Sequence, residues 1–263
     1  MFEWLPYEIV CKILSYLDTE DFISTSLSCK VFKRALNDVS TWSQRLQRHG
    51  IVLSYEEIND IGLEALKLTY KVWGQNLLEN PNCDKGLEFE EDISGPMPLK
   101  LANIEGWTVN DRGCFKLEKN VGLESWPAEA GFAHHNVATA YDDGVRSQTI
   151  RLESKLPVVA QQLKGSGRKV EVHWSVWVAP RFKRGSQFTA SLSWSKGSET
   201  EHFELARVDF NTDKMWRKLE KVVVLDGCDN GVFEYKERGN DSRFWPGYFG
   251  VKILNPTITI KIK

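Results

Sequence analysis

The pattern of hydrophobic positions is clearest near the start of the chain, between Trp4 and Leu46. Apolar residues recur there at the three- and four-residue spacing of one helix face, and polar residues interrupt the recurrence. This pattern predicts four short helices. Their apolar stripes are Ile9, Ile13, Leu14 and Leu17; then Phe22, Ile23 and Leu27; then Val31, Phe32, Ala35 and Leu36; and last Trp42 with Leu46.

Residues that favour helix starts stand in front of each stripe. Pro6 suits the first position of a helix, where a missing N–H group costs nothing. The polar run 18–21 offers N-cap residues for the second helix, Ser28 for the third and Ser40 for the fourth. We therefore expect the helices to begin at these residues.

This segment holds more apolar side chains than a unit of its size can bury by itself. Two interpretations follow. The surplus can lie in the groove of a partner protein, as in helix-in-groove recognition, or it can pack on the domain that follows. The pattern alone leaves both open.

Residues 5–17 read Leu-Pro-x-Glu-Ile-Val-x-Lys-Ile-Leu-Ser-Tyr-Leu, and Asp21, Ser26-Leu-Ser-Cys-Lys-x-Phe and Trp42 follow. In this order and spacing the segment resembles an F-box. The resemblance implies a helical module that docks on the Skp adaptor of a cullin–RING ubiquitin ligase, and it favours the partner groove. The residues that match the adaptor-facing start of the motif are Leu5, Pro6, Ile9, Ile13, Leu14 and Leu17.

Composition limits the remaining possibilities. The chain has 263 residues, 41% of them hydrophobic, and a formal net charge of -2, which does not favour nucleic acid or an anionic membrane as a partner. The 5 cysteines are scattered without a Cys-x-x-Cys pair and indicate free thiols in a reducing compartment. We see neither a signal peptide nor the ~18 apolar residues of a membrane span, so we expect a cytoplasmic protein.

A helical pattern returns from Tyr55 to Trp73 after a connector over residues 47–54. It predicts one further helix, which Gly62 weakens slightly. This helix can act as a rigid spacer or can be an ordinary packing helix of the second domain. The expected domains are an F-box over 2–48, a linker helix over 49–75 and a β-domain over 76–263.

From Asn76 onward, short alternating runs stand between Gly, Pro, Asn and Asp residues. Many strands without crossover helices predict an antiparallel β-sandwich, so the fold class is α+β multidomain. Residues 170–178 alternate strictly, as in a half-buried strand. The expected strands are 107–109, 114–118, 147–153, 170–178, 188–194, 203–208, 219–225, 231–235, 248–254 and 257–262.

This second half also resembles a family. Residues 76–82 read Asn-Leu-Leu-Glu-Asn-Pro-Asn, and the block 241–255 reads Asp-Ser-Arg-Phe-Trp-Pro-Gly-Tyr-Phe-Gly-Val-Lys-Ile-Leu-Asn. With Gly106-Trp107 and the run 147–152 between them, these blocks resemble the F-box-associated domain of the sugar-recognising F-box proteins. The resemblance implies a jelly-roll-like β-sandwich that holds a substrate at the loops of one end.

The aromatic pair Phe244-Trp245 is the first candidate for that loop end. An exposed aromatic pair can lie against the apolar face of a sugar ring while Asp241 takes its hydroxyl groups, or it can plug the end of the sandwich. In the glycan-binding members this loop carries an aromatic residue, a Trp and a Lys. Phe244 and Trp245 match the first two, but Pro246 stands at the third and donates no hydrogen bond.

Two further segments bear on the same site. The loop 127–143 is long for a β-sandwich, and the resemblance makes Phe132 the counterpart of an aromatic wall of the sugar pocket. Its adjacent histidines have no third ligand at a suitable spacing, so we expect no metal. Trp177 matches the family's Asp-Trp-Tyr-Ser-Gly-Arg segment, but Val176 replaces the Asp. The candidate substrate- or glycan-binding residues are Phe132, Trp177, Asp241, Phe244 and Trp245.

No catalytic pattern emerges from the sequence. It contains neither a Gly-rich phosphate loop nor a Gly-x-Ser-x-Gly elbow, and we expect no catalytic residues and no cofactor. The basic turn at residues 180–184 fits a solvated hairpin tip better than a nucleic-acid site. By resemblance, the chain is a non-catalytic substrate receptor of a Skp–cullin–F-box ubiquitin ligase. Its sandwich binds either the N-glycans of glycoproteins or a protein target without glycans, and an enzyme of β-sandwich type is the competing class.

Overall fold

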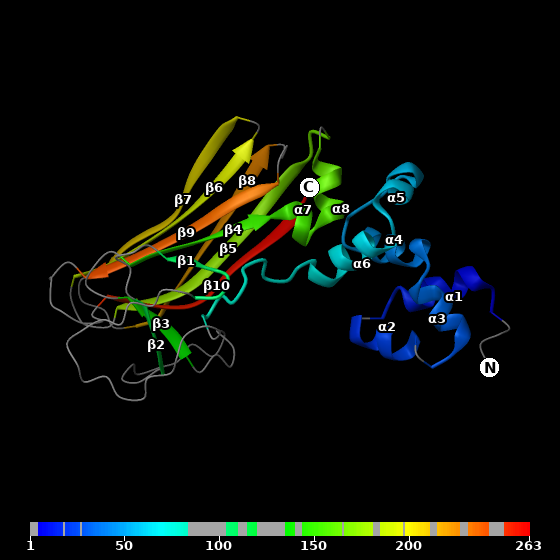
Figure 1. Ribbon diagram of the computed structural model, residues 1–263, viewed down its shortest axis with the longest axis horizontal. Helices are drawn as coiled ribbons and strands as arrows, with labels where there is room; N and C mark the ends of the chain where they lie inside the picture. The colour runs from blue at the N-terminus through cyan, green and yellow to red at the C-terminus, as the bar shows by residue number, and fades with distance from the viewer. Residues whose placement is uncertain are drawn as a thin grey trace.

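Helices make up the first part of the described chain, and β-strands make up most of the rest (Figure 1). The structure is a computed structural model. It describes residues 5–17, 19–26, 28–83, 104–109, 115–119, 135–139, 144–164, 166–180, 185–196, 198–210, 215–226, 231–241 and 250–263. No helix among these residues is long and apolar enough to cross a membrane.

The helical head, residues 5–50, has the four helices that the apolar spacing predicts. Their inward faces form one core, in which the rings of Phe22 and Trp42 meet edge-on with centroids 5.1 Å apart. Leu46 is fully buried beside them. The helices are α1 (Tyr7–Leu14), α2 (Thr19–Ser26), α3 (Lys30–Leu36) and α4 (Val39–Arg48).

The expected starts of three helices are shifted. Asp38, not Ser40, caps α4, because its carboxylate accepts hydrogen bonds from the backbone nitrogen of Ser40 at 2.7 Å and from its hydroxyl at 2.6 Å. A charged acceptor binds these donors more strongly than a hydroxyl does. Cys29 precedes α3, and the Ser28 hydroxyl instead donates to a carbonyl at the end of α2. Pro6 was expected at the first position of α1, but it is the N-cap residue, and the helix begins one residue later at Tyr7.

Two helices replace the single helix predicted between the head and the strands. Gly62 separates α5 (Tyr55–Ile61) from α6 (Leu63–Val72) with a φ of 78°, a conformation that glycine adopts without strain. α6 packs against α8 (Pro157–Leu163). This helix and the single turn before it, α7 (Leu152–Lys155), were not predicted, because the pattern around them is that of strands.

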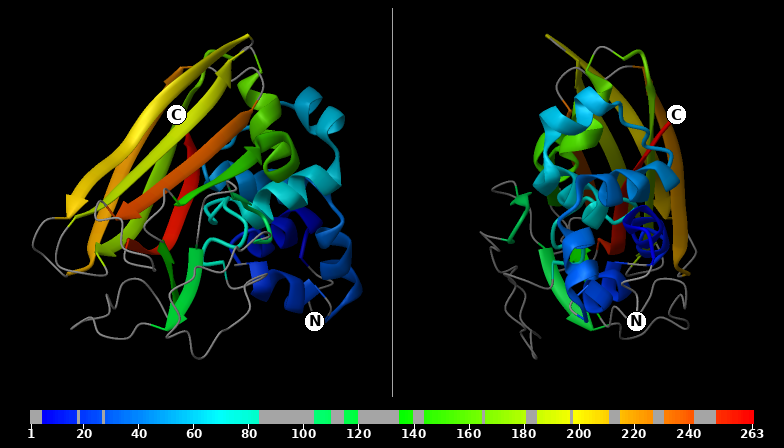
Figure 2. Two further views of the ribbon diagram at one scale, coloured as in Figure 1. Left: turned by 60° about the vertical axis from the view of Figure 1, so that its left-hand side comes forward. Right: turned by 90° about the vertical axis from the view of Figure 1, so that its right-hand side faces the viewer.

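Hydrogen bonds from side chains fasten this helical region together. The Thr69 hydroxyl of α6 is buried and accepts a hydrogen bond from the backbone nitrogen of Val158 at 3.2 Å. The Gln162 side chain of α8 donates to the carbonyl of Val52 at 2.6 Å. Figures 1 and 2 show α6, α7 and α8 between the head and the sheets. The head is therefore joined to the strands through a packed interface.

The strands form two five-stranded sheets within the described residues, and all their neighbouring pairs are antiparallel. The first sheet has the order β1-β4-β9-β6-β7, and the second has the order β2-β3-β10-β5-β8. Helices followed by antiparallel sheets confirm the predicted fold class. The strands are β1 (Thr108–Val109), β2 (Phe115–Lys119), β3 (His135–Thr139), β4 (Gly144–Arg151), β5 (Lys169–Pro180), β6 (Ser186–Lys196), β7 (Glu199–Phe210), β8 (Arg217–Asp226), β9 (Val232–Asp241) and β10 (Val251–Ile262).

Two strands differ from the prediction. β3 lies inside the segment 127–143, which was predicted from the sequence pattern to be one long loop. β10 is a single strand where two were expected. Its pairing with β5 shifts in register between Leu254 and Thr257, and the strand continues on both sides of this shift. Asn255 takes up this irregularity with a φ of 49°. The bounds of the other predicted strands lie within six residues of the observed ones.

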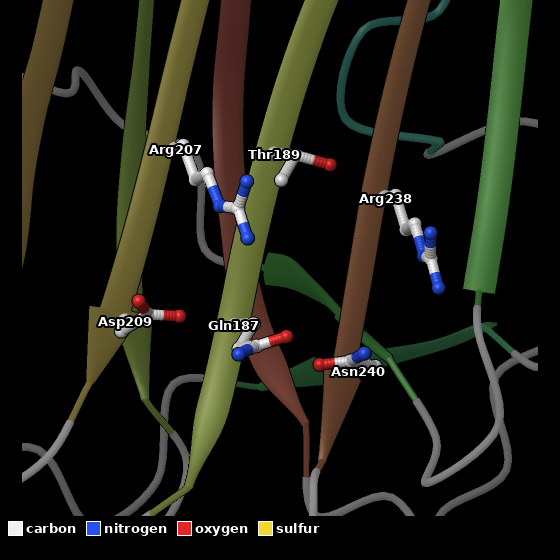
Figure 3. A pocket seen from close by; sticks show the side chains of 6 residues that line it. All are labelled: Gln187, Thr189, Arg207, Asp209, Arg238 and Asn240. Atoms are coloured by element: carbon white, nitrogen blue, oxygen red, sulfur yellow. The ribbon is translucent and has the colours of Figure 1, made fainter.

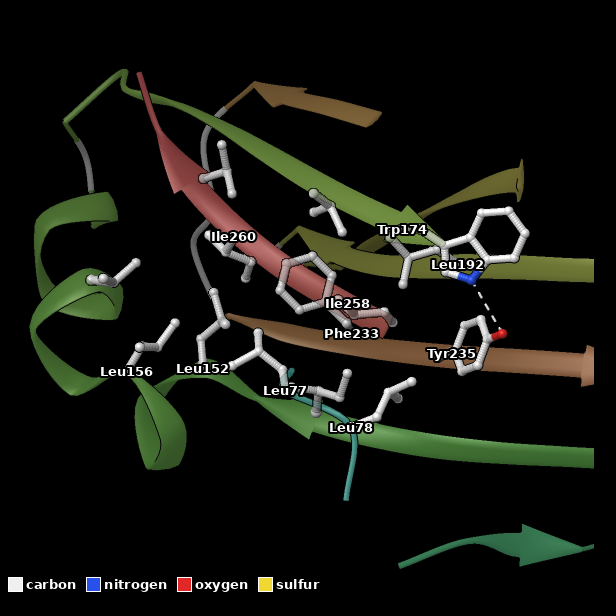
Figure 4. Close-up of a cluster of buried hydrophobic side chains, with 14 of the residues drawn as sticks. Leu77, Leu78, Leu152, Leu156, Trp174, Leu192, Phe233, Tyr235, Ile258 and Ile260 are labelled. Carbon is white, nitrogen blue, oxygen red and sulfur yellow. Dashed lines mark hydrogen bonds between the residues drawn. The ribbon is translucent and has the colours of Figure 1, made fainter. Parts of the chain in front are cut away.

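The inner faces of the two sheets share one core (Figure 4). The strict alternation predicted for residues 170–178 is confirmed, since Val170, Val172 and Trp174 all point inward and are buried. The Trp174 indole donates across the core to the hydroxyl of Tyr235 in the opposite sheet at 3.2 Å. Leu77 and Leu78, which follow the helical region, complete this core.

A buried ion pair lies beside this core. Arg146 of β4 and Glu237 of β9 are direct cross-strand partners, their side chains are fully buried, and they form a salt bridge. The Tyr235 hydroxyl donates to Glu237 at 2.7 Å, and burial raises the pKa of Tyr235. Burial alone would lower the pKa of Arg146, but Cys83 and Glu237 outweigh it and raise the pKa. Both charges are therefore compensated inside the protein, which is the condition for burying them.

The carboxamide of Asn76 fastens the chain to β10. Its nitrogen donates to the carbonyl of Pro256 at 2.7 Å, and its oxygen accepts from the backbone nitrogens of Ile258 at 2.9 Å and Leu78 at 3.2 Å. Next to it, the backbone nitrogen of Leu77 donates to the carbonyl of Ile258 at 2.8 Å. The segment that leaves α6 is thus held against the middle of β10.

We predict that Asn76→Ala lowers the free energy of unfolding by about 3 kcal/mol, because three hydrogen bonds to backbone groups disappear. Urea unfolding measures this change. Asn59→Ala, on the exposed side of α5, is the matched control and should stay within about 0.5 kcal/mol of the unmodified chain. Equal urea midpoints for the two variants would show that Asn76 does not hold the joint.

Candidate functional site

An apolar ridge on α1 is exposed to solvent. Leu5, Ile9 and Ile13 follow one another at four-residue spacing and have exposed fractions of 39%, 43% and 50%. We call these three residues the α1 ridge. Large apolar side chains that follow one another at helical spacing, and that no described part of the chain covers, are typical of a surface that binds another protein.

The opposite face of α1 anchors it in the head. Val10, Cys11 and Leu14 are each 1% exposed and belong to the core. The Arg45 guanidinium donates to the carbonyl of Leu14 at 3.0 Å, and Arg48 donates to the carbonyl of Ser15. Cations at the carboxyl end of a helix satisfy its last carbonyls and oppose its negative pole. The ridge is thus presented by a helix held along its buried face and at its end.

Arg45 connects α1 with other parts of the head and with α6. It is fully buried, and its guanidinium carbon lies 4.5 Å from the ring centre of Phe22, 5.4 Å from that of Trp42 and 4.2 Å from that of Tyr70. Cation–π contacts of a desolvated arginine are stronger than exposed ones. A single side chain therefore joins the core of the head to the helix that leads to the sandwich.

The start of α1 is held by a hydrogen bond of 2.8 Å from the Tyr7 hydroxyl to Asp38. Burial, together with this bond, raises the pKa of Tyr7 above its ordinary value. Burial also acts to raise the pKa of Asp38, but hydrogen bonds from Ser40 and Tyr7 outweigh it and keep the pKa low. Asp38 is therefore ionised at neutral pH while it caps α4 and binds Tyr7.

The predicted adaptor-facing residues do not all lie on the same side of α1. Leu5, Ile9 and Ile13 are exposed as expected, and Pro6 is exposed beside them. Leu17 is half-buried against the core. Leu14 was expected on the adaptor-facing surface, but its side chain lies inside the head, because each residue turns about 100° around the helix axis from the one before it, and this turn takes Leu14 from the exposed side of Ile13 to the core.

Phe132, Phe244 and Trp245 lie outside the described residues, and so does the side chain of Asp241 at the end of β9. Trp177 is half-buried against Trp216, Ala179 and Leu254. Its neighbour Val176, which replaces the family's Asp, is fully buried in the core. The gathering of these residues into one pocket remains a prediction.

A polar cleft on the first sheet was not predicted. It has a volume of about 320 Å³ and lies on the face of β6, β7 and β9 that points away from the core (Figure 3). In the sequence, the residues that line it have the pattern of solvent-exposed positions on separate strands. Only the pairing of the strands brings them together. The residues that line it are Gln187, Thr189, Arg207, Asp209, Arg238 and Asn240.

Comparisons with known proteins agree with the head described above. Residues 2–48 match the family model described as F-box-like, so the chain carries an F-box-like domain at its N-terminus. Over most of its length it is also similar to F-box only proteins. Human F-box only protein 44 is 21% identical over 264 residues, which cover 97% of this chain and 95% of the relative. F-box only protein 6 of Mus musculus is 21% identical over 97% of this chain and 82% of its own length.

Solved structures resemble the sandwich weakly. A xylan-binding domain from carbohydrate-binding module family 22 has a TM-score of 0.37 at 12% identity and covers 68% of this chain and 97% of its own. The structure of TmCBM61 in complex with β-1,4-galactotriose has a TM-score of 0.37 at 14% identity and covers 72% of this chain and 99% of its own. These values are too low to bear on what this chain binds.

The two faces of α1 predict effects of very different size for the same substitution at adjacent positions. Ile13→Asp should change the free energy of unfolding by less than about 1 kcal/mol, because the carboxylate stays in water. Leu14→Asp should cost more than about 4 kcal/mol, because it places an unpaired charge in the core. Urea unfolding of both variants measures the difference. A small effect of Leu14→Asp would mean that Leu14 is not a core residue.

Proposed function

We propose that this protein is the substrate-recognition subunit of a Skp–cullin–F-box ubiquitin ligase. In this proposal the α1 ridge docks on the Skp adaptor, and the sandwich binds the protein to be modified. The observation that carries the proposal is the exposed ridge on an F-box-like domain. F-box proteins in general are substrate adaptors and not enzymes, which agrees with the absence of a catalytic pattern in the sequence.

The size of the ridge supports a binding role. Complete burial of a Leu or Ile side chain is worth ~1.5–3 kcal/mol. Leu5, Ile9 and Ile13 still expose 39–50% of their surface, so a partner that covers all three gains ~2–4 kcal/mol from them. A few such residues at the centre of an interface supply much of its affinity. The ridge is therefore an anchor that a partner groove can use.

The packed joint supports the second half of the proposal. A receptor of this type contributes by holding its substrate near the ubiquitin-carrying enzyme, which raises the local concentration of the substrate. Such a function benefits from a fixed distance between the two binding surfaces. Asn76, Thr69 and Gln162 join the helical region to the sandwich and its short helices, and so limit motion between them.

For the substrate, the proposal favours a protein target without glycans over N-glycans. A site that orients sugar hydroxyls needs polar side chains around them. Val176, at the position of the family's Asp, is fully buried in the core and has no polar group to offer. Pro246 takes the place of the family's Lys. The proposal also places the protein in the cytoplasm, which is supported by the described cysteines Cys11, Cys29 and Cys83, since none of them forms a disulfide.

The double variant Ile9→Asp, Ile13→Asp should abolish co-purification with the Skp adaptor while the urea midpoint stays near that of the unmodified chain. The reason is that two carboxylates would be buried without partners in the adaptor's groove. Val222→Asp is the matched control, because Val222 on β8 has the same exposed fraction of 50% as Ile13. Undiminished co-purification of the double variant would contradict the docking surface.

On an array of N-glycans, the full chain should give no signal above that of Trp245→Ala. The physical reason is the loss of the two polar side chains that Val176 and Pro246 replace. Fluorescence of the labelled protein on the array is the readout. Binding to high-mannose glycans that disappears in Trp245→Ala would reverse the choice and make N-glycans the substrate class.

A further inference from the structure

The exposed apolar residues of the sandwich gather at strand β8. Within the described part of the sandwich, the large apolar side chains that are exposed are Met215, Val222 and Val224. Val222 and Val224 lie on β8 itself, and Met215 lies two residues before the strand begins. The neighbours of the two valines on β5 are His173 and Glu171, so the apolar surface does not continue across the sheet. It is confined to the strand at the edge.

The backbone of β8 is open along one side. β8 is the last strand in the order β2-β3-β10-β5-β8, and it pairs with β5 over its whole length without a shift in register. Within the described part of the chain, the backbone of residues 219–225 bonds to no segment other than β5. An edge strand of this kind presents a row of N–H and C=O groups to which a further strand can bond.

The other edges of the two sheets are protected in ways that proteins commonly use. β1 has 2 residues and β2 has 5, which is short for a template. β7 exposes several glutamates, its pairing with β6 shifts in register, and the Lys221 side chain donates to its carbonyl at Glu204. Residues 222–225 of β8 instead read Val-Val-Val-Leu. Among the described strands, β8 is therefore the edge that is best suited to accept another strand.

The sequence of β8 is complementary to itself when two copies run antiparallel. A twofold axis perpendicular to the sheet places one residue opposite its own copy and keeps the outer faces on the same side. With Val222 at this axis, Lys218 lies opposite Asp226 of the second copy on the outer face. On the inner face, Leu219 lies opposite Leu225 of the second copy. Opposite charges that face each other across two strands stabilise the pairing.

The neighbouring registers bring like charges together, which destabilises a strand pair. An axis at Glu220 or at Lys221 sets that charge against its own copy, and an axis at Val223 sets Glu220 opposite Asp226 at both ends. Among the registers that pair more than half of β8, only the one centred on Val222 has no like-charge pair. The charges of the strand therefore select this register for a second copy of the chain.

The ion pairs that these charges form within the chain do not conflict with this arrangement. Lys218 lies 2.7 Å from Glu220, Asp226 lies 3.2 Å from Lys169, and all four side chains are open to solvent. Surface ion pairs contribute little to stability and exchange partners at little cost. The charges choose between registers, while the exposed valines and the open backbone provide the attraction.

We propose that a second copy of this chain pairs with the open edge of β8, antiparallel and with Val222 at the twofold axis, so that two sandwiches share one continuous sheet. The contact covers the exposed valines of both copies and gives partners to backbone groups along the edge. One strand pair is a small interface, so we expect a dissociation constant of about 10–100 µM. The inference is independent of the proposed function, because the α1 ridge lies on the head and takes no part.

Sedimentation velocity of the full chain over a wide range of concentrations, from about 5 to about 500 µM, tests the proposal. The sedimentation coefficient should rise with concentration toward that of a dimer. Val222→Lys should weaken the association at least about tenfold, because two ammonium groups then face each other at the axis. The double variant Ile9→Asp, Ile13→Asp is the matched control. It removes the other exposed apolar surface and should leave the dissociation constant within about twofold.

Reversal of the charges tests the register. Lys218→Glu and Asp226→Lys should each weaken the association at least about threefold, and their combination should restore it to within about twofold of the unmodified chain. Glu220→Gln is the control, because it removes the partner of Lys218 within the chain and should leave the association unchanged. Urea midpoints show whether each variant is folded. If Val222→Lys does not fold, the charge reversals decide.

A zero-length cross-link identifies the contact directly. A carbodiimide joins an amine and a carboxylate that touch, and it takes up the water that their condensation releases. Within one copy of β8, Lys218 and Asp226 are separated by eight residues, about 26 Å, so they cannot be joined. A linked Lys218–Asp226 peptide pair in the mass spectrum of the dimer band should therefore come from two copies.

The following results would overturn the proposal. The chain stays monomeric at every concentration, or Val222→Lys associates as tightly as the unmodified chain. The variant Ile9→Asp, Ile13→Asp loses the association, which would make the α1 ridge the contact. The combined charge reversal shows no recovery and the Lys218–Asp226 link is missing, which would assign the dimer to another register or surface.

Discussion

The arrangement of the whole chain depends on how the segment after α6 is bonded to β10. The pairing of β10 with β5 breaks between Leu254 and Thr257, and beside this break the carbonyl of Pro256 and the nitrogen of Ile258 both bond to the carboxamide of Asn76. A break in a strand leaves backbone groups that need partners, and one side chain meets this need from the linker. Because α6 and α8 pack beside this point, the head extends away from the sheets and α1 lies far from them (Figure 1).

The elements that the sequence predicted are those in which one residue spacing decides the structure. The strict alternation in residues 170–178 fits only a strand, and the structure has the strand β5 at these residues. Gly62 shows the limit of this approach, since a glycine inside a helical pattern is either tolerated or a break, and here the packing of the following helix on α8 selects the break. α8 was missed although Val159 and Leu163 have helical spacing, because strands surround it in the sequence.

The candidate site, like the fold, was only partly predictable from the sequence. The motif located the binding surface on α1, but α1 is apolar on two sides, so the pattern could not separate Ile13, which is exposed, from Leu14, which is buried. The cleft was beyond prediction, since Thr189, Arg207 and Arg238 are isolated polar positions in three separate strands. Only the pairing of those strands places the two arginines on either side of the threonine.

That pairing is itself fixed from the inside of the sheet. In β9, Glu237 points inward to its cross-strand partner Arg146, and the next residue, Arg238, points outward into the cleft. A slip of β9 by one residue would bring Arg238 into the core and leave Arg146 buried without its carboxylate. Breaking a buried ion pair in this way costs about 3–5 kcal/mol, a large part of the stability of a typical domain. The buried pair therefore fixes the register of β9, which keeps Arg238 opposite Thr189.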